Sequence, residues 1–319
     1  MLFPINPSTV AKYRDAFTHS GAKDDPSDAR IQTKILENHM DKLRVIMPDT
    51  PEIRALVQHV ENRRKLVQDR VDLTNKITTT LKNYFPQILE WFPEKDTVIF
   101  CDFLLKWSAL STVKKARKST RITFFNRHNS RYTEAIDRRI RAIKEAVALT
   151  DDLAVIEPNQ LMIEIFIPQL KLLIDSIAQM DRVIRKYYRT QKDAFIFDSL
   201  PGTGPQLAPR LMAAMGSNQD RYNNAAEIQK YVGGATVIER SGQKSWTHWR
   251  YSCPKFLRQA FVEWAGHTVK YSFWARAYYQ QQIEKGKSHN TVIRSLAFKW
   301  IRIVFTCWKE RNPMMNQNI

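Results

Sequence analysis

Two long heptad patterns constrain the fold of this chain more than any other feature of its sequence. The first pattern begins after Thr50 and runs to about Tyr84. Its repeating positions, seven residues apart, are Ile53, Val60, Val67, Thr74 and Leu81, and Val57 and Val71 support them. This repeat predicts a long helix with one apolar face, and Thr50 followed by Pro51 is typical of a helix start.

The second pattern lies in a helix that we expect over about residues 158–192. Its apolar positions alternate spacings of four and three: Phe166, Leu170, Leu173, Ile177, Met180, Ile184 and Tyr187. Such a seam is typical of coiled coils. It packs either against the Thr50 helix within one chain or against a second copy, and a four-helix arrangement combines both.

The remaining sequence also favours helices. Only 9 of the 319 residues are glycine, and Leu, Ile, Lys, Arg, Glu and Gln form long stretches. We expect several short helices over residues 86–157 and helices over residues 10–17 and 29–38. Leu2 to Pro7 predicts the end of a buried strand that runs into a turn. The sequence therefore predicts a mainly α fold.

The balance of charges points to an anionic partner. The chain has 50 Lys and Arg against 32 Asp and Glu, a net charge of +18. A field of this size favours nucleic acid. No apolar run approaches the roughly 18–20 residues that span a bilayer, and we expect no secretion leader. The cysteines, Cys101, Cys253 and Cys307, are far apart, which favours a reducing cytoplasm over a disulfide framework or a zinc site.

A glycine-rich turn lies between two apolar stretches at residues 200–208, Leu-Pro-Gly-Thr-Gly-Pro-Gln-Leu-Ala. Gly202 and Gly204 in such a turn are typical of a helix-hairpin-helix, whose backbone N–H groups face a DNA phosphate. Glycine is needed there because a Cβ atom would block the close approach. The alternative is a plain turn between two helices.

A serine lies between two cations in residues 231–245, after a helix that we expect to end at Gly233 and a short apolar strand. Ser241 follows Arg240, and Gly242 and Lys244 come after it. An exposed serine beside a glycine could attack a phosphodiester, while the cations neutralise the phosphate oxygens. The alternative is an ordinary turn serine.

Four motifs occur in a fixed order: Pro-Gly-x-Gly-Pro at 201–205, Tyr-x-Gly at 231–233, Arg-Ser-Gly-x-Lys-Ser at 240–245, and a basic, aromatic tail that closes at Asn312-Pro313. Over roughly residues 198–313 they resemble the transposase domain of the "one-ten" insertion-sequence family, relatives of the Piv invertase. The serine of this motif is that family's nucleophile and forms a phosphoserine with DNA. The resemblance implies this role for Ser241.

An acidic run, Lys23-Asp24-Asp25-Pro26-Ser27-Asp28-Ala29, precedes the helix expected at residue 29. Asp25 and Asp28 are three residues apart, so they either cap the helix or share a Mg²⁺ ion. The run resembles the family's Lys-Thr-Asp-x-x-Asp-Ala motif, which supplies the last two carboxylates of a RuvC-like DEDD site. The resemblance implies that both aspartates are catalytic residues and Mg²⁺ ligands.

Family members carry two further acids upstream, and this sequence begins after both. The resemblance therefore predicts a C-terminal remnant of the RuvC-like domain at residues 1–45, a helical coiled-coil linker at 46–193, and a serine transposase domain with a helix-hairpin-helix at 194–313. Two functions remain open. One is a DNA transposase or site-specific recombinase; the other is an inactive truncated remnant that binds DNA or RNA.

The resemblance also implies partners. Active relatives work as oligomers with a structured bridge RNA that pairs with target and donor DNA, so we expect DNA, a guide RNA and further copies of the chain as partners. In the tail from Trp246 onward, basic residues alternate with aromatic ones at helical spacing. This spacing favours a packed core for most of the rings, and it gives no ligand-like pattern to His248, His267 and His289.

Overall fold

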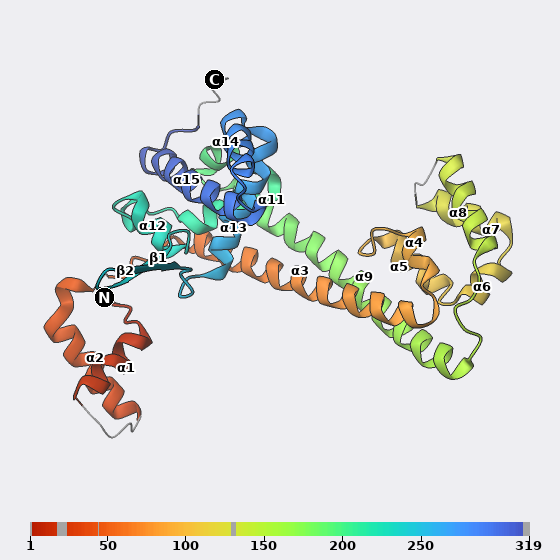
Figure 1. The fold of residues 1–319 in the computed structure, drawn as a ribbon, viewed down its shortest axis with the longest axis horizontal. Coiled ribbons are helices and arrows are strands. Elements are labelled where there is room, and N and C mark those ends of the chain that lie inside the picture. Colours follow the sequence, from red (N-terminus) through yellow and green to blue (C-terminus); the bar gives the residue numbers. More distant parts are fainter. Residues whose placement is uncertain (1, 18–23, 44, 129–131, 315–319) are drawn as a thin grey trace.

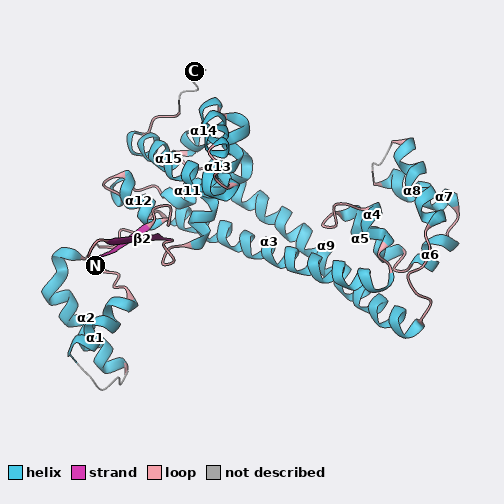
Figure 2. Ribbon diagram, viewed as in Figure 1, coloured by secondary structure: helices cyan, strands magenta, loops and turns pink. Residues whose placement is uncertain are grey.

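The computed structural model describes residues 2–17, 24–43, 45–128 and 132–314 and has an elongated shape (Figure 1). Helices make up most of these ranges, together with one two-stranded sheet (Figure 2). The prediction of a mainly α fold is confirmed. None of the helices in these ranges is both long and apolar enough to cross a membrane.

Two long helices form a straight arm between two lobes (Figure 1). They are α3 (Pro51–Tyr84) and α9 (Leu153–Arg189). Their antiparallel pairing shows in two contacts: Arg63 pairs with Asp181 near one end, and Asn83 lies 3.2 Å from Asn159 near the other. The packing of the two heptad patterns within one chain is therefore confirmed.

The arm differs from the sequence expectation in detail. Helix α9 begins at Leu153, because the Asp152 side chain accepts a hydrogen bond from the Ala154 N–H at 2.9 Å. The start expected at residue 158 is therefore wrong, and Pro158 lies inside the helix. On α3, Val71 is 43% exposed. The predicted positions Ile53, Val60 and Leu81 are buried, and Leu56, Leu73 and Ile77 complete the buried face.

The distal lobe consists of five short helices, as predicted for residues 86–157, and packs on the far end of the arm (Figure 1). They are α4 (Gln87–Trp91), α5 (Val98–Lys106), α6 (Leu110–Lys115), α7 (Lys118–Arg127) and α8 (Thr133–Glu145). Phenylalanine rings fill the core, and Phe103 lies 5.0 Å from Phe92 and 5.6 Å from Phe124 between ring centroids.

The C-terminal lobe packs on the near end of the arm. Its helices are α10 (Ala194–Asp198), α11 (Gly204–Met215), α12 (Ala225–Tyr231), α13 (Lys255–Tyr271), α14 (Phe273–Glu284) and α15 (His289–Glu310). Three tryptophans are completely buried in it, and the indole N–H of each donates a hydrogen bond. Trp264 donates to the Pro201 carbonyl, Trp300 to the Thr268 hydroxyl and Trp308 to the Gly216 carbonyl, at 2.8–2.9 Å. For these rings the core prediction is confirmed.

The N-terminal segment contains α1 (Pro7–Phe17) and α2 (Asp25–His39) and a 3₁₀ turn, η1 (Met40–Lys42). The buried strand predicted from residue 2 is wrong: Leu2 is 72% exposed, and residues 2–6 are not a strand. Leu2 accepts one hydrogen bond, from the Ile46 N–H at 2.8 Å. One such bond does not make a ladder, because a sheet needs several paired residues.

Candidate functional site

Ser241 lies at the tip of an antiparallel hairpin formed by β1 (Val237–Ser241) and β2 (Lys244–His248). The strand predicted before the serine is therefore confirmed. Gly242 and Gln243 form the two-residue turn, and Gly242 has a φ of 58°. A positive φ at the first central position is typical of a type II′ turn, and glycine adopts it at low cost. The glycine after the serine thus ends the strand at Ser241.

The register of the hairpin decides which cation accompanies the serine. Ser241 lies directly opposite Lys244, and Arg240 lies opposite Ser245. Directly opposed residues share one face of a hairpin, with Cβ atoms about 4.5–5.5 Å apart, and successive residues point to opposite faces. Lys244 therefore shares the face of Ser241, whereas Arg240 lies on the other face.

The same face carries a hydrogen-bonded group that the sequence analysis missed. Glu239 accepts hydrogen bonds from the Trp246 indole N–H and the His248 ring, each at 2.8 Å. The hydrogen bond from His248 is the largest cause that lowers the pKa of Glu239, and in return Glu239 raises the pKa of His248. The alternation of charged and aromatic residues two apart was the signal that could have revealed this group.

The base of the hairpin is held against the C-terminal lobe. The helix before it ends close to the predicted Gly233, which has a φ of 70°. A Cβ atom at this position would lie 2.4 Å from the Cys253 sulfur, so glycine permits the close approach. By contrast, a Cβ atom at Gly242 would meet no atom within 4 Å. The base is therefore packed while the tip projects into open space.

The glycine-rich turn connects α10 to α11, as predicted. Gly202 and Gly204 have φ angles of 71° and 55°. The Thr203 hydroxyl between them is buried and donates to the carbonyls of Phe197 and Leu200, at 3.1 and 3.0 Å. A Cβ atom at Gly202 would lie 2.7 Å from the Tyr271 ring, whereas one at Gly204 would meet open space. Gly204, the first residue of α11, is therefore the accessible side of the turn.

The acidic run begins a helix four residues earlier than expected. Asp24 is the N-cap of α2 and accepts a hydrogen bond from the Ser27 N–H at 2.6 Å. Its hydrogen bonds with Ser27 lower the pKa of the Asp24 carboxyl. The cap role considered for Asp25 and Asp28 therefore belongs to Asp24, and Lys23 of the motif lies outside the described residues.

The two aspartates predicted as metal ligands differ in their surroundings. Asp25 is exposed in the first turn of α2, and Asp28 forms an ion pair with Arg14 of α1. Within the part of the chain that the structure describes, no three His, Cys, Asp or Glu side chains gather as they would around a metal ion. A guanidinium competes with a cation for Asp28, so these two carboxylates do not by themselves form a metal centre.

The structure thus brings together only some of the predicted site residues. Ser241, Gly242 and Lys244 lie at one hairpin tip, with Arg240 on its opposite face. Gly202 and Gly204 lie in a separate turn of the same lobe. In the view of Figure 1 the hairpin lies between the helices α13–α15 and the N-terminal helices α1 and α2, which carry the acidic pair.

Comparisons with known proteins match two separate parts of the chain. A family model described as transposase of the IS116/IS110/IS902 family matches residues 194–280, which include the turn and the hairpin. A transposase model of the DEDD type from IS110 matches residues 1–86, which include the acidic pair. The DEDD match suggests a requirement for a divalent metal.

Two relatives from Streptomyces match nearly the whole chain. A protein of S. coelicolor that is described as "Mini-circle putative transposase for IS117" is 26% identical over 99% of this chain and 78% of its own length. An uncharacterized 44.8 kDa protein of insertion element IS116 from S. clavuligerus is 24% identical over 95% of this chain and 75% of its own length. Together the models and relatives support a transposase of the IS110/IS116 family.

Proposed function

We propose that this chain, a transposase of the IS110/IS116 family by these matches, cleaves and rejoins DNA strands through a covalent bond between Ser241 and a DNA phosphate. The observation that carries the proposal is the hairpin tip, where Ser241 is exposed and lies directly opposite Lys244. A nucleophile must reach a phosphodiester of bulky duplex DNA, and a projecting tip permits this approach.

The proposed reaction exchanges one phosphodiester bond for another. The Ser241 Oγ atom attacks the phosphorus and loses its proton, while the bond from phosphorus to one deoxyribose oxygen breaks. That oxygen takes up a proton and leaves as a hydroxyl group. Attack by the hydroxyl of another strand end reverses these steps and frees the serine. Each exchange conserves the number of phosphate ester bonds, so rejoining needs no external energy source.

Lys244 and Arg240 take different parts in this proposal. Because Lys244 shares the face of Ser241, its ammonium group can approach the non-bridging oxygens of the attacked phosphate and stabilise the charge that develops there. Arg240 lies on the other face and would contact a neighbouring phosphate of the backbone. We therefore expect Lys244 to affect the rate and Arg240 to affect mainly the affinity.

The turn at residues 201–205 provides the proposed second contact with DNA. The open side of Gly204 lies at the first residue of α11, where backbone N–H groups lack helical partners and the helix dipole favours an anion. The buried Thr203 hydroxyl holds the turn from behind. We propose that this turn binds a backbone phosphate and thereby orients the duplex.

The roles of Asp25 and Asp28 as catalytic Mg²⁺ ligands stay a prediction. Asp28 would have to exchange its ion pair with Arg14 for the metal, and further ligands would have to come from outside the described residues, from water or from DNA phosphate. Asp25 needs no such exchange, because it is exposed. In the function predicted from the resemblance, this acidic site with Mg²⁺ would act together with Ser241 in cleaving and rejoining the strands.

A guide RNA and an oligomeric assembly are further proposals. The distal lobe presents a basic run in and around α6 and α7: Lys114, Lys115, Arg117 and Lys118. This run can bind the phosphates of a structured RNA. On α9, Leu161, Ile165 and Leu172 remain 45–66% exposed, which favours contact with another copy of the chain.

One observation favours the alternative, a protein that binds DNA or RNA without cutting it. The described residues supply two carboxylates of a DEDD site and no group of three possible ligands. The turn and the basic residues would keep their binding roles in such a protein. The two candidate functions differ in one measurable property, the formation of a covalent adduct.

The proposal is tested with nicked DNA that carries an end of the insertion sequence. After incubation with the full chain and denaturation with detergent, we expect a protein–DNA adduct from the wild type and none from Ser241→Ala. Ser245→Ala is the matched control, because Ser245 lies in the same hairpin on the opposite face. An adduct with Ser241→Ala would show that another residue is the nucleophile. Binding without any adduct would favour the alternative.

A further inference from the structure

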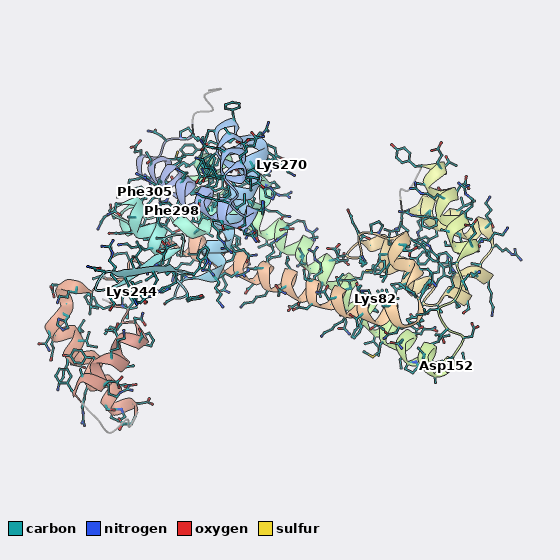
Figure 3. All side chains as sticks on the ribbon, in the orientation of Figure 1. Lys82, Asp152, Lys244, Lys270, Phe298 and Phe305 are labelled. Atoms are coloured by element: carbon teal, nitrogen blue, oxygen red, sulfur yellow. The ribbon has the colours of Figure 1, made fainter. Side chains whose placement is uncertain are left out.

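A pocket of about 480 Å³ lies between α14, α15 and the base of the hairpin. Three cations and three aromatic rings line it: Arg294, Lys299, Arg302, Trp249, Tyr278 and Phe298. Figure 3 labels Phe298 on the C-terminal lobe. No aspartate or glutamate is among the described residues that line the pocket. Its charge therefore favours an anion, and its rings favour a flat, partly apolar group.

The cations and rings are already arranged in pairs. The Arg294 guanidinium lies 4.3 Å from the centroid of the Trp249 ring, and the Lys299 ammonium lies 5.0 Å from that of Tyr278. A guanidinium that stacks on a ring keeps its N–H groups free at its edge, where they can bind phosphate oxygens. The stacked guanidinium also offers a flat surface on which a nucleobase can stack.

The pocket is connected directly to the strand that carries the proposed nucleophile. Gly234 and Thr236, which also line it, precede β1, so Ser241 lies five residues beyond Thr236. An extended strand rises about 3.4 Å per residue, which places the serine roughly 17 Å from this end of the pocket. A DNA strand bound at the tip can therefore reach the pocket within a few nucleotides.

We propose that this pocket binds one unstacked nucleotide of a single DNA strand. The base stacks on the Arg294 guanidinium, which itself lies on the Trp249 ring, and its phosphate is held by Arg302 and Lys299. The volume lies within the range of about 300–1,000 Å³ that is usual for small-molecule sites, so it suits one nucleotide rather than a duplex. That this nucleotide belongs to the strand attacked by Ser241 rests on the function proposed above.

A bound base has a consequence that phosphate contacts alone lack. Basic side chains on a surface bind every phosphate of a strand alike, so removal of one base leaves such binding unchanged. Removal of the one base that occupies a stacking pocket lowers the affinity at that position only. The presence of a position-dependent loss therefore distinguishes the pocket from a general basic surface.

The experiment measures the affinity of the full chain for fluorescent single-stranded DNA in which one abasic site is moved along the strand. To separate binding from chemistry, it is carried out with Ser241→Ala. We expect one position where the missing base lowers the affinity about tenfold. In Lys299→Ala/Arg302→Ala the pocket no longer holds the phosphate, so the nucleotide is not retained there and the position-dependent loss disappears. The slope of log affinity against log salt concentration decreases by about 0.7, as the loss of one neutralised phosphate of a single strand predicts.

Two further variants control the result. Lys76→Ala/Lys82→Ala removes the same charge from exposed positions of α3, where Figure 3 labels Lys82 far from Phe298, and should keep the position-dependent loss. Arg294→Lys keeps the charge but removes the flat guanidinium, so it should reduce the loss at the one position while the salt slope stays unchanged. Thermal unfolding of each variant shows whether the fold is intact.

The possible outcomes decide the proposal. Equal affinity for every abasic position would overturn it in favour of a phosphate-only groove, and so would a position-dependent loss that persists in Lys299→Ala/Arg302→Ala. The same scan with RNA would overturn the DNA assignment if only RNA showed the loss. A position-dependent loss in a protein whose wild type forms no adduct would uphold the pocket and refute Ser241 as nucleophile, so the two proposals fail separately.

Discussion

The turn at residues 201–205 and the β1–β2 hairpin are both glycine-containing loops of the C-terminal lobe, yet the protein holds them in different ways. The turn is anchored from below: Trp264 donates to the Pro201 carbonyl at 2.9 Å, and Thr203 is buried. In the hairpin, Ile238 and Trp246 remain 57% and 47% exposed. The hydrogen bonds that Glu239 accepts from Trp246 and His248 connect one strand of the hairpin to the other and not to the lobe.

This difference suits the two tasks that we propose for these loops. A phosphate-binding turn gains affinity when its N–H groups are fixed before DNA arrives, because less ordering is needed on binding. A hairpin tip that must reach a phosphodiester and then move with a covalently attached strand benefits from weak contacts to the lobe. The following predictions test whether the turn is the more firmly held of the two loops.

The largest effect is expected from the tryptophan under the turn. Trp264→Phe removes the hydrogen bond to Pro201 and leaves a cavity in the core, so it should lower the free energy of unfolding by about 2–3 kcal/mol. Trp246→Phe, its counterpart in the hairpin, should change it by less than about 0.5 kcal/mol, since the ring is half exposed. Urea unfolding of both variants measures the difference, and equal losses would contradict the comparison.

A smaller effect is expected from a side chain on the open side of the turn. Asn tolerates a positive φ, so Gly204→Asn should keep the fold but obstruct the approach of a phosphate, and weaken DNA binding about tenfold. Gly286→Asn is the matched control, because Gly286 has a φ of 77° and open space but lies in the α14–α15 loop. Fluorescence anisotropy with duplex DNA measures both. Unchanged binding by Gly204→Asn would exclude the turn as a phosphate site.

The smallest effect is a pH dependence of the hairpin. Glu239 raises the pKa of His248 above its ordinary value of 6.5, so the pair stabilises the hairpin fully below that pH and loses this contribution as the pH rises through the raised pKa. The pKa of Glu239 is lowered below its ordinary value of 4.5. The pair therefore stabilises the hairpin fully above pH 4.5, and this stabilisation is lost as the pH falls through the lowered pKa of Glu239. The hairpin should therefore be most stable between about pH 4.5 and 6.5.

The fluorescence of Trp246, which donates to Glu239, reports this pH dependence. His248→Gln should remove the fluorescence change on the basic side of the window. The change on the acidic side should persist at a higher pH, because the hydrogen bond from Trp246 still lowers the pKa of Glu239 after the larger contribution of His248 is lost. A basic-side change that persists in this variant would show that another group is responsible. The turn offers a contrast, because its hydrogen bonds from Trp264 and Thr203 involve no group that titrates in this range.

Much of the fold follows from local sequence signals. The heptad positions of the arm predicted α3 and α9, and the cap at Thr50, whose hydroxyl accepts from the Ile53 N–H at 3.4 Å, marked the start of α3. The strand from Leu2 was predicted from a short apolar run, a signal that cannot tell a strand from an extended segment. Pairing along the whole segment would decide it, and pairing depends on residues far away in the sequence.

The candidate site shows the same limit. The order of the motifs singled out Ser241, Gly202 and Gly204, and the two glycines at 202 and 204 predicted the turn between α10 and α11. The sequence could not tell that Lys244 rather than Arg240 faces the same way as the serine, because this depends on where the turn sets the register. Nor could it show that Arg14 is the partner of Asp28.

The sequence by itself determined the helices, the glycine turns and the excess of positive charge, because periodicity, φ preferences and composition act over a few residues or over the whole chain. Only the tertiary structure decided which tryptophans are buried, which cation stands opposite the serine, and that Trp249, Tyr278 and Arg302 line one pocket. These outcomes depend on packing between distant segments, where the gain from burial exceeds local preferences.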